Sequence, residues 1–371
     1  MEITKNKIIG IDHLRGLAIF LVFFFHYTIV NKGEPQWLAD NASFGWIGVD
    51  LFFVISGYLI SSQLFAQIKN EKKLSFARFF IKRFFRIIPA FIATLAIYFL
   101  IPPFREKESL PPLWKFLTFT QNLGLNIQEQ GTFSHCWSLC VEEHFYLLFP
   151  IILILLQRFK LLRSGLFIIT GLFIAGFIIR HISYNNFYLP NSSEENGWMY
   201  WYKFIYYPTY NRIDGLTIGV SIAAFETFKR SVFEKTHNHN KLFFIIGTIL
   251  LFAAYILCGD QSTYNASVFG FPIIALGFGS ILISVLSPNN FLHEQKRGMN
   301  LLAPLSYSIY LTHKGVIHVM NTTINTFDIP KNLLFVLTII ACIIFAYFMQ
   351  QIIEKPFMKL RVKIENHLDK K

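Results

Sequence analysis

Long apolar segments recur along the whole chain, and they constrain its fold more than any other feature of the sequence. A stretch of about 18 or more apolar residues is long enough to cross the hydrocarbon core of a bilayer as a helix. We therefore predict an all-α polytopic membrane protein with about ten transmembrane helices. The segments lie at approximately 8–30, 46–66, 87–103, 137–156, 164–183, 204–225, 242–258, 267–287, 301–320 and 332–353.

The composition agrees with a membrane protein of a single domain. Hydrophobic residues make up 53% of the 371 residues and charged residues only 15%, against about 25% charged in an average soluble domain. The first apolar segment is too long for a signal peptide, contains Arg15 and lacks a small-residue cleavage site, so we expect a retained helix. We treat 1–371 as one membrane domain with its core at about 8–356, and we expect no fused extracytoplasmic domain.

The net charge of +12 is explained by orientation in a membrane rather than by binding to nucleic acid. Lys and Arg are about three times as frequent in one set of alternate connections, which includes both chain ends, as in the other set. Cytoplasmic connections of membrane proteins carry this excess. We therefore expect both termini in the cytoplasm and membrane lipids, especially anionic ones, as partners.

The first segment, IDHLRGLAIFLVFFFHYTIV, carries the ionisable residues Asp12, Arg15 and His26. Eleven residues of an α-helix turn through about three full turns and rise about 16 Å, so Arg15 and His26 share a face. Ionisable groups inside a membrane are costly and usually face a cavity or a partner. The shared face favours a lined pathway. The alternative is an interfacial pair of Asp12 with Arg15 and a histidine that bonds another helix.

A basic stripe precedes the third segment in FARFFIKRFFRIIPAF. Arg78, Lys82, Arg83 and Arg86 lie on one side of a helix, with most of the phenylalanines elsewhere, which is typical of an amphipathic interfacial helix. One interpretation is an anchor to anionic lipid. The other is a cytoplasmic dock for a polyphosphorylated ligand, because guanidinium groups pair well with phosphate oxygens.

Polar side chains also fall within or at the ends of four other segments. Two consecutive carboxylates at the start of the fourth segment favour a functional role, whereas Arg212 and Asp214 in the sixth could simply pair with each other. Two cysteines beside a histidine in HCWSLC are better explained as buried small side chains than as metal ligands, so we expect no metal. The candidates are Asp50, Ser56, Trp137, Glu142, Glu143, Arg212, Asp214, Tyr310 and His313.

These stretches, taken in order, resemble the acyltransferase type 3 family of integral-membrane O-acyltransferases. The first segment carries that family's Arg-x10-His signature as Arg15 and His26, preceded by Asp12. Further matching pieces are GVDLFFVISGYLI, RFFRIIP, HCWSLCVEEHFYLLFP, NRIDGL, SYSIYLTH and EKP. Two departures, HCWSL for the more usual HTWSL and Glu-Glu-His for Glu-Glu-Gln, remove no charged position.

The resemblance implies transfer of an acyl group, usually acetyl, from cytoplasmic acyl-CoA to a sugar hydroxyl on the outer side of a bacterial inner (plasma) membrane. A histidine is suited to act as general base or to carry the acyl group. The acceptor, a glycan or lipid-linked sugar, stays open: lipopolysaccharide, capsule, exopolysaccharide, wall glycan or glycoside. The rival interpretation is a transporter or exporter that uses the same residues as a relay.

On this hypothesis acyl-CoA is a co-substrate, and no bound cofactor is expected. We expect the basic stripe to bind the donor. His26, Arg15, Asp12, Glu142 and His313 would form the catalytic group, and the other polar candidates would bind substrate.

Overall fold

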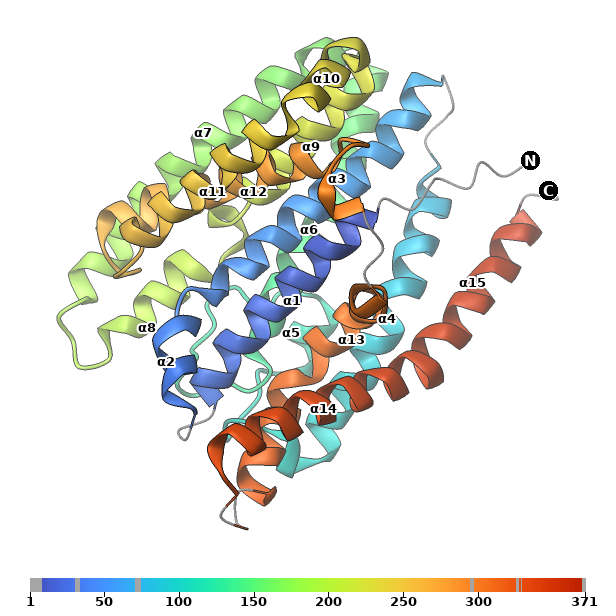
Figure 1. Ribbon diagram of the computed structural model, residues 1–371. Helices are drawn as coiled ribbons and strands as arrows, with labels where there is room; N and C mark the ends of the chain where they lie inside the picture. The colour runs from blue at the N-terminus through green and yellow to red at the C-terminus, as the bar shows by residue number, and fades with distance from the viewer. Residues whose placement is uncertain are drawn as a thin grey trace.

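The computed structural model describes residues 9–30, 34–70, 75–293, 297–324, 327 and 329–368. Helices account for nearly all regular structure in these ranges, and no strand occurs among them. The helices pack side by side as one elongated bundle (Figure 1). The prediction of an all-α polytopic protein is confirmed.

Each of the ten predicted segments contains one long helix. Short helices lie between or after them: α2 (Gln36–Ala42), α5 (Leu113–Leu117), α8 (Gly197–Trp201), α10 (Arg230–Thr236) and α15 (Lys355–Leu368). The long helices are α1 (Ile9–Val30), α3 (Gly48–Lys69), α4 (Phe76–Leu100), α6 (Trp137–Arg158), α7 (Gly165–Ser183), α9 (Asp214–Phe228), α11 (Asn240–Leu257), α12 (Phe271–Val285), α13 (Arg297–Val319) and α14 (Lys331–Met349).

Among the described residues, eight helical stretches are long and apolar enough to cross a membrane by themselves. The two predicted segments outside this set contain α9 and α13. Helix α9 has only 15 residues, and the predicted first part of this segment instead holds the end of a π-helix (Tyr202–Tyr206) and a short 3-10 helix (Thr209–Asn211). Helix α13 has 23 residues but carries several Ser, Thr, His and Lys side chains. Both helices are packed inside the bundle, where neighbouring helices rather than lipid surround their polar groups.

The basic stripe and the third apolar segment form one continuous helix. Helix α4 begins after Ser75, whose hydroxyl accepts a hydrogen bond from the Arg78 backbone N–H, and it continues through Pro89 to Leu100. The expected interfacial helix is therefore the first part of a spanning helix. This continuity fixes the basic side chains relative to the bundle interior.

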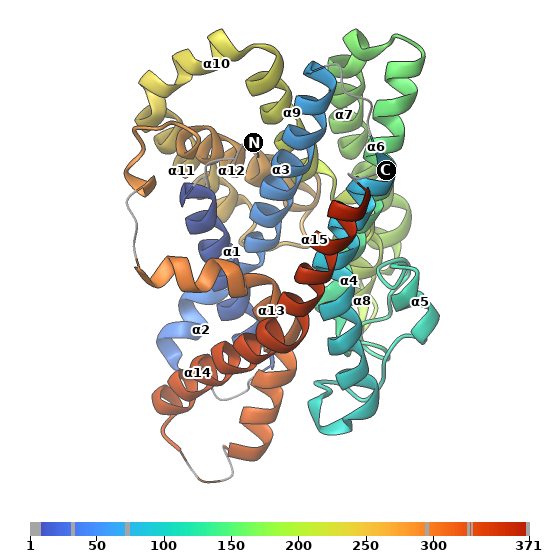
Figure 2. The same ribbon diagram turned by 90° about the vertical axis from the view of Figure 1, so that its right-hand side faces the viewer.

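The chain alternates between the two ends of the bundle. Helix α1 begins and α15 ends toward the same end, which also carries α10 (Figures 1 and 2). The short helices α2, α5 and α8 lie toward the other end, in the connections that follow α1, α4 and α7. An even number of long helices, ten in the described ranges, places the start of α1 and the end of α15 at the same end of the bundle.

Small residues allow α3 and α9 to pack closely against each other. A Cβ atom on Gly57 would lie 2.3 Å from the carbonyl O of Leu216, and one on Gly219 would lie 2.3 Å from the carbonyl O of Val54. Glycine is therefore required where the two backbones cross, as is common between membrane helices.

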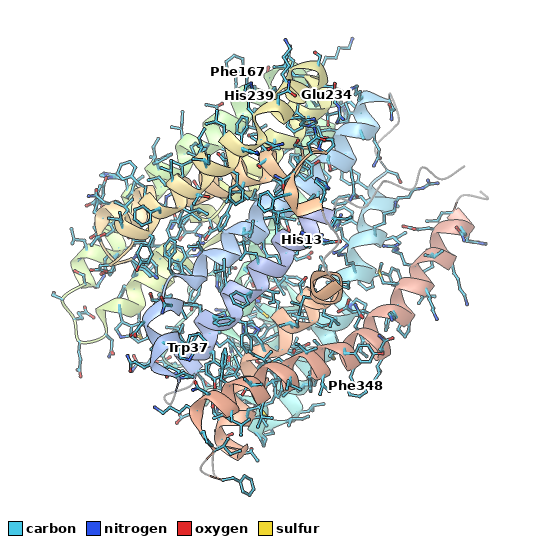
Figure 3. All side chains as sticks on the ribbon, in the orientation of Figure 1. His13, Trp37, Phe167, Glu234, His239 and Phe348 are labelled. Carbon is cyan, nitrogen blue, oxygen red and sulfur yellow. The ribbon has the colours of Figure 1, made fainter. Side chains whose placement is uncertain are left out.

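The outside of the bundle is apolar, and polar groups are concentrated inside it. Phe167 and Phe348 project from the periphery (Figure 3) with 78% and 55% of their surface exposed. In contrast, Arg180, Arg212 and His313 are almost fully buried. This inverted distribution suits a molecule surrounded by lipid tails, where buried polar groups must find partners within the protein.

Candidate active site

Two histidines from opposite ends of the sequence meet inside the bundle. His26 on α1 and His313 on α13 place Nδ1 and Nε2, respectively, 2.8 Å apart, and their ring centroids are 4.9 Å apart. Helices α1 and α13 form one of the most extensive contacts in the bundle. The packing of these helices thus brings together two residues that the sequence singled out separately.

The backbone of α13 holds the His313 ring in place. Nδ1 of His313 lies 2.9 Å from the carbonyl O of Ile309 and 2.7 Å from that of Tyr310. The His313 side chain is fully buried, whereas His26 is only half-buried. Of the two imidazoles, His26 is therefore the one that a substrate can approach.

A third imidazole, His135, adjoins the pair, and the sequence interpretation gave it no role. It lies in the short turn Ser134–Cys136 before α6, with its ring centroid 5.0 Å from His313 and 5.8 Å from His26. Its Nε2 is 3.3 Å from the carbonyl O of Leu311. The position of His135 at the start of an apolar segment was the sequence signal that could have identified it.

The histidine nitrogens lie at hydrogen-bond distance from each other. Within the described ranges, no group of three or more His, Cys, Asp and Glu is arranged to hold a metal ion. The 2.8 Å separation of the His26 and His313 nitrogens is a hydrogen-bond distance, and it leaves no room for an ion between them.

A cavity with an empty volume of about 770 Å³ lies among α1, α3, α4, α6 and α13. Both polar and apolar side chains form its walls, including three guanidinium groups. The lining residues are Arg15, Phe52, Ser56, Leu59, Ile60, Arg83, Arg86, Ile87, Ser138, Leu139, Glu142, Tyr146, Ser306, Tyr307 and Tyr310.

Only part of the predicted basic stripe reaches this cavity. Arg83 and Arg86 line it, whereas Arg78 and Lys82 lie outside it; of the four, Arg83 is partly buried and the others are exposed. The Lys82 ammonium is 4.0 Å from the Glu365 carboxylate on α15, so that part of the stripe contacts another surface helix. Two of the four residues of the predicted donor site therefore line the cavity.

Arg15 supplies the third guanidinium of the cavity wall. Its Nη1 is 3.5 Å from the Asp12 carboxylate one turn earlier on α1, which confirms that these two residues pair. His26 lies about 16 Å further along the same helix, and it is not among the cavity-lining residues.

Glu142 is the carboxylate that projects into the cavity. Ser56 donates a hydrogen bond of 3.0 Å to one of its oxygens, and the Tyr146 hydroxyl donates one of 2.7 Å to the other. The Arg83 guanidinium lies 5.5 Å from the centre of the Tyr146 ring. Glu143 does not line the cavity, so the structure separates the roles of the two adjacent carboxylates.

Tyr310 lies between the cavity and the histidines. Its ring lines the cavity and lies 5.9 Å, between centroids, from the ring of His313. The Tyr310 hydroxyl donates a hydrogen bond to the carbonyl O of His135 and shares another with Ser138. Tyr310 therefore contacts both the cavity and the histidine cluster, and the predicted polar path from Arg15 to His26 stays a prediction.

The three charged candidates on α3 and at the start of α9 form buried ion pairs away from the cavity. Arg212 pairs with Asp50 at 2.8 Å, and Asp214 pairs with Arg180 at 2.6 Å. The suggested pairing of Arg212 with Asp214 is therefore wrong, because each has a closer partner on another helix. The centre of the Trp137 ring lies 4.9 Å from the Cζ atom of the Arg212 guanidinium.

A buried ion pair next to the histidines was also missed from the sequence. The Lys314 ammonium lies 2.9 Å from the Glu106 carboxylate and 3.2 Å from the Ser134 hydroxyl. Glu106 comes from the connection between α4 and α6 and also accepts a hydrogen bond from the Phe133 N–H. The pair ties this connection to α13, one residue after His313.

The fold and the site define a helical membrane protein with an internal histidine pair beside a basic cavity. Comparison with known proteins identifies the class further. The family model described as acyltransferase domain matches residues 8–350. The chain belongs to this acyltransferase family.

Curated relatives agree with this assignment. O-acetyltransferase OatA of Staphylococcus aureus (strain NCTC 8325 / PS 47) is 27% identical over 384 residues, covering 98% of this chain and 59% of the relative. Peptidoglycan O-acetyltransferase OatA of Listeria monocytogenes serovar 1/2a (strain ATCC BAA-679 / EGD-e) is 26% identical, covering 96% and 56%. The chain thus spans somewhat more than half the length of these relatives. No solved structure matches the chain significantly.

Proposed function

We propose that this chain is a membrane O-acyltransferase that moves an acetyl group from cytoplasmic acetyl-CoA to a hydroxyl of a cell-surface or exported glycan. The observation that carries the proposal is the His26–His313 pair, in which His313 lies against Tyr310 of the wall of a basic cavity. Membership of the acyltransferase family supports the reaction type.

The cavity suits the donor because its charge is unbalanced. Arg15, Arg83 and Arg86 line it, against one lining carboxylate, Glu142. Guanidinium groups recognise phosphate oxygens by paired, charge-assisted hydrogen bonds. We assign the phosphates of acetyl-CoA to Arg83 and Arg86 and the thioester arm to the inner part of the cavity, toward Tyr310.

The acceptor reaches His26 from the other side in this proposal. His26 takes the proton of the acceptor hydroxyl while the oxygen attacks the thioester carbonyl carbon. The C–S bond then breaks, the CoA thiolate leaves, and the proton returns from His26 to the sulfur. An acyl-histidine formed at His26 is the alternative route to the same products.

A glycan is the acceptor class that the relatives favour. The proteins from Staphylococcus and Listeria are named as O-acetyltransferases, and the second as a peptidoglycan O-acetyltransferase. We extend a glycan acceptor to this chain on that basis. We further place the protein in the bacterial plasma membrane with both termini in the cytoplasm, which puts the basic wall of the cavity on the side where acyl-CoA is made.

Transfer of label from acetyl-labelled CoA into glycan tests the proposal directly. Membranes with wild-type protein should incorporate label, and membranes with His26→Ala at matched expression should incorporate none above background. Full incorporation by His26→Ala would contradict the proposed chemistry. Movement of labelled glycan into sealed vesicles without any acyl-CoA would instead indicate a transporter.

A further inference from the structure

We propose that His313 is a positioning residue that keeps the proton of neutral His26 on Nδ1, so that Nε2 of His26 is the nitrogen that exchanges a proton with the acceptor hydroxyl. This inference rests on the proposed acyl transfer and specifies which atom performs it. It also separates the roles of the two histidines.

The direction of the hydrogen bonds follows from the partners of His313. Its Nδ1 faces the carbonyl oxygens of Ile309 and Tyr310 at 2.9 and 2.7 Å. Carbonyl oxygens only accept hydrogen bonds, so Nδ1 of His313 must carry a proton. In the neutral ring, Nε2 of His313 then has a lone pair and must accept.

The same argument applies to His26, whose Nδ1 lies 2.8 Å from Nε2 of His313. Because Nε2 of His313 accepts, Nδ1 of His26 must donate its proton to it. The neutral His26 ring can hold only one proton, so its Nε2 has the free lone pair. Two backbone carbonyls of α13, acting through His313, thus favour this tautomer of His26, whose ring also hydrogen-bonds the backbone of Val22 on α1.

His313 itself is poorly placed to exchange protons with a substrate. Both of its nitrogens are engaged in hydrogen bonds, and the side chain is fully buried. A proton relay through it would have to deliver its Nδ1 proton to a backbone carbonyl, which is a very weak base. Relay is therefore blocked after one step, and orientation remains as the role of His313.

The pair also stabilises the charged state of His26. When Nε2 of His26 takes the acceptor's proton, the bond from Nδ1 to His313 becomes charge-assisted and stronger. The Lys314 ammonium next in sequence would oppose a second positive charge, but Glu106 lies 2.9 Å from it. The arrangement resembles a base with an orienting partner, in which the partner is a neutral imidazole instead of a carboxylate.

Two variants of His313 test the positioning role in the transfer assay. His313→Leu removes the acceptor for Nδ1 of His26, and we expect kcat to fall by about 100-fold or more with the KM for acetyl-CoA within about threefold of wild type. His313→Gln can place its amide oxygen near the former Nε2, so it should recover most of that loss. Both variants are compared with wild type at matched yield and dispersity in detergent.

The tautomer can be measured without any activity. In protein labelled with ¹⁵N-histidine and reconstituted in lipid, signals of His26 are assigned by their loss in His26→Ala. We expect a protonated Nδ1 and an unprotonated Nε2 in the wild type at neutral pH. A proton on Nε2, or a His313→Leu enzyme as active as wild type, would overturn the inference while leaving the proposed function standing. Activity in His26→Ala would instead refute the proposed function.

Discussion

At the scale of single residues, the four cations of the α4 stripe illustrate how position on a helix divides similar side chains. Arg83 and Arg86 line the cavity beside Arg15, while Arg78 and Lys82 are exposed outside it. The periodicity of the helix predicts that the four lie on one side. It does not predict where the cavity begins, because that depends on the helices packed against α4.

This division leads to a prediction about donor binding. The double variant Arg83→Gln, Arg86→Gln should raise the KM for acetyl-CoA by about tenfold or more per guanidinium removed, because each charge-assisted hydrogen bond contributes roughly 1.5–3 kcal/mol. These contacts are far from the reacting bond, so kcat should change little. Initial rates at varied acetyl-CoA concentration in membranes measure both constants.

The matched control is Arg78→Gln, which removes the same charge from the same helix outside the cavity. It should leave the KM for acetyl-CoA nearly unchanged at physiological ionic strength, since exposed charges are screened over about 8 Å. Equal effects of the two sets of substitutions would mean that surface charge, and not the cavity, attracts the donor.

Partner choice among the buried charges could not be predicted from the sequence. Arg212 and Asp214 are close in the chain, yet they pair with Asp50 on α3 and Arg180 on α7. Near-complete burial makes an unpaired charge very costly, so pairing itself was expected. The choice of partner depends on how the three helices are rotated and packed against one another. This packing cannot be read from the local sequence.

At the scale of elements, the crossing of α3 and α9 at Gly57 lies next to Ser56, which lines the cavity. The helices approach so closely at Gly57 and Gly219 that a single added methyl group would overlap a backbone atom. A Cβ on Gly219 would also lie 2.5 Å from the backbone N of Tyr58. The atoms nearest to an added Cβ at this crossing belong to the backbone, so they cannot move aside as a side chain could.

Replacement of Gly219 by Ala should therefore destabilise the protein. Overpacking of this kind costs typically about 1–3 kcal/mol, and we expect a lower midpoint of thermal unfolding in detergent. Gly171→Ala on α7 is the control, because nothing lies within 4 Å of an added Cβ there and Ala is favoured over Gly inside a helix. A Gly219→Ala protein as stable as Gly171→Ala would show that the crossing is looser than described.

The apolar segments predicted the long helices well, and their failures occur where polar residues gather. Each of the ten segments contains a long helix, since length and apolarity suffice to define a spanning helix. The segment at 204–225 forms a continuous α-helix only from Asp214, because Pro208 interrupts its first part between a π-helix and a short 3-10 helix. Similarly, the cavity and the position of His135 beside the other histidines depend on contacts between helices. No single segment of the sequence specifies these contacts.

At the scale of the whole molecule, orientation is the property that the proposed reaction requires. Helix α10, which carries Arg230 and Lys235, lies at one end of the bundle, and α2, α5 and α8 lie at the other (Figure 2). The native cysteines are all buried. This leaves a nearly silent background for chemical labelling of introduced cysteines.

Two exposed serines make a matched pair for measuring the orientation. Ser193→Cys lies in the connection before α8, and Ser231→Cys lies in α10. With both termini in the cytoplasm, a maleimide that cannot cross membranes should label Ser193→Cys in intact spheroplasts and label Ser231→Cys only after permeabilisation. The opposite pattern would place acetyl-CoA on the wrong side of the cavity and refute the proposed direction of transfer.

The position of Tyr310 has a consequence for the cell that goes beyond catalysis. A plasma membrane stores energy as a difference in proton concentration and electrical potential across it. A continuous water-filled passage from Arg15 to His26 would let protons leak and dissipate that store. The Tyr310 hydroxyl is bonded to Ser138 and to the His135 backbone, and we expect these bonds to help keep the resting membrane electrically tight.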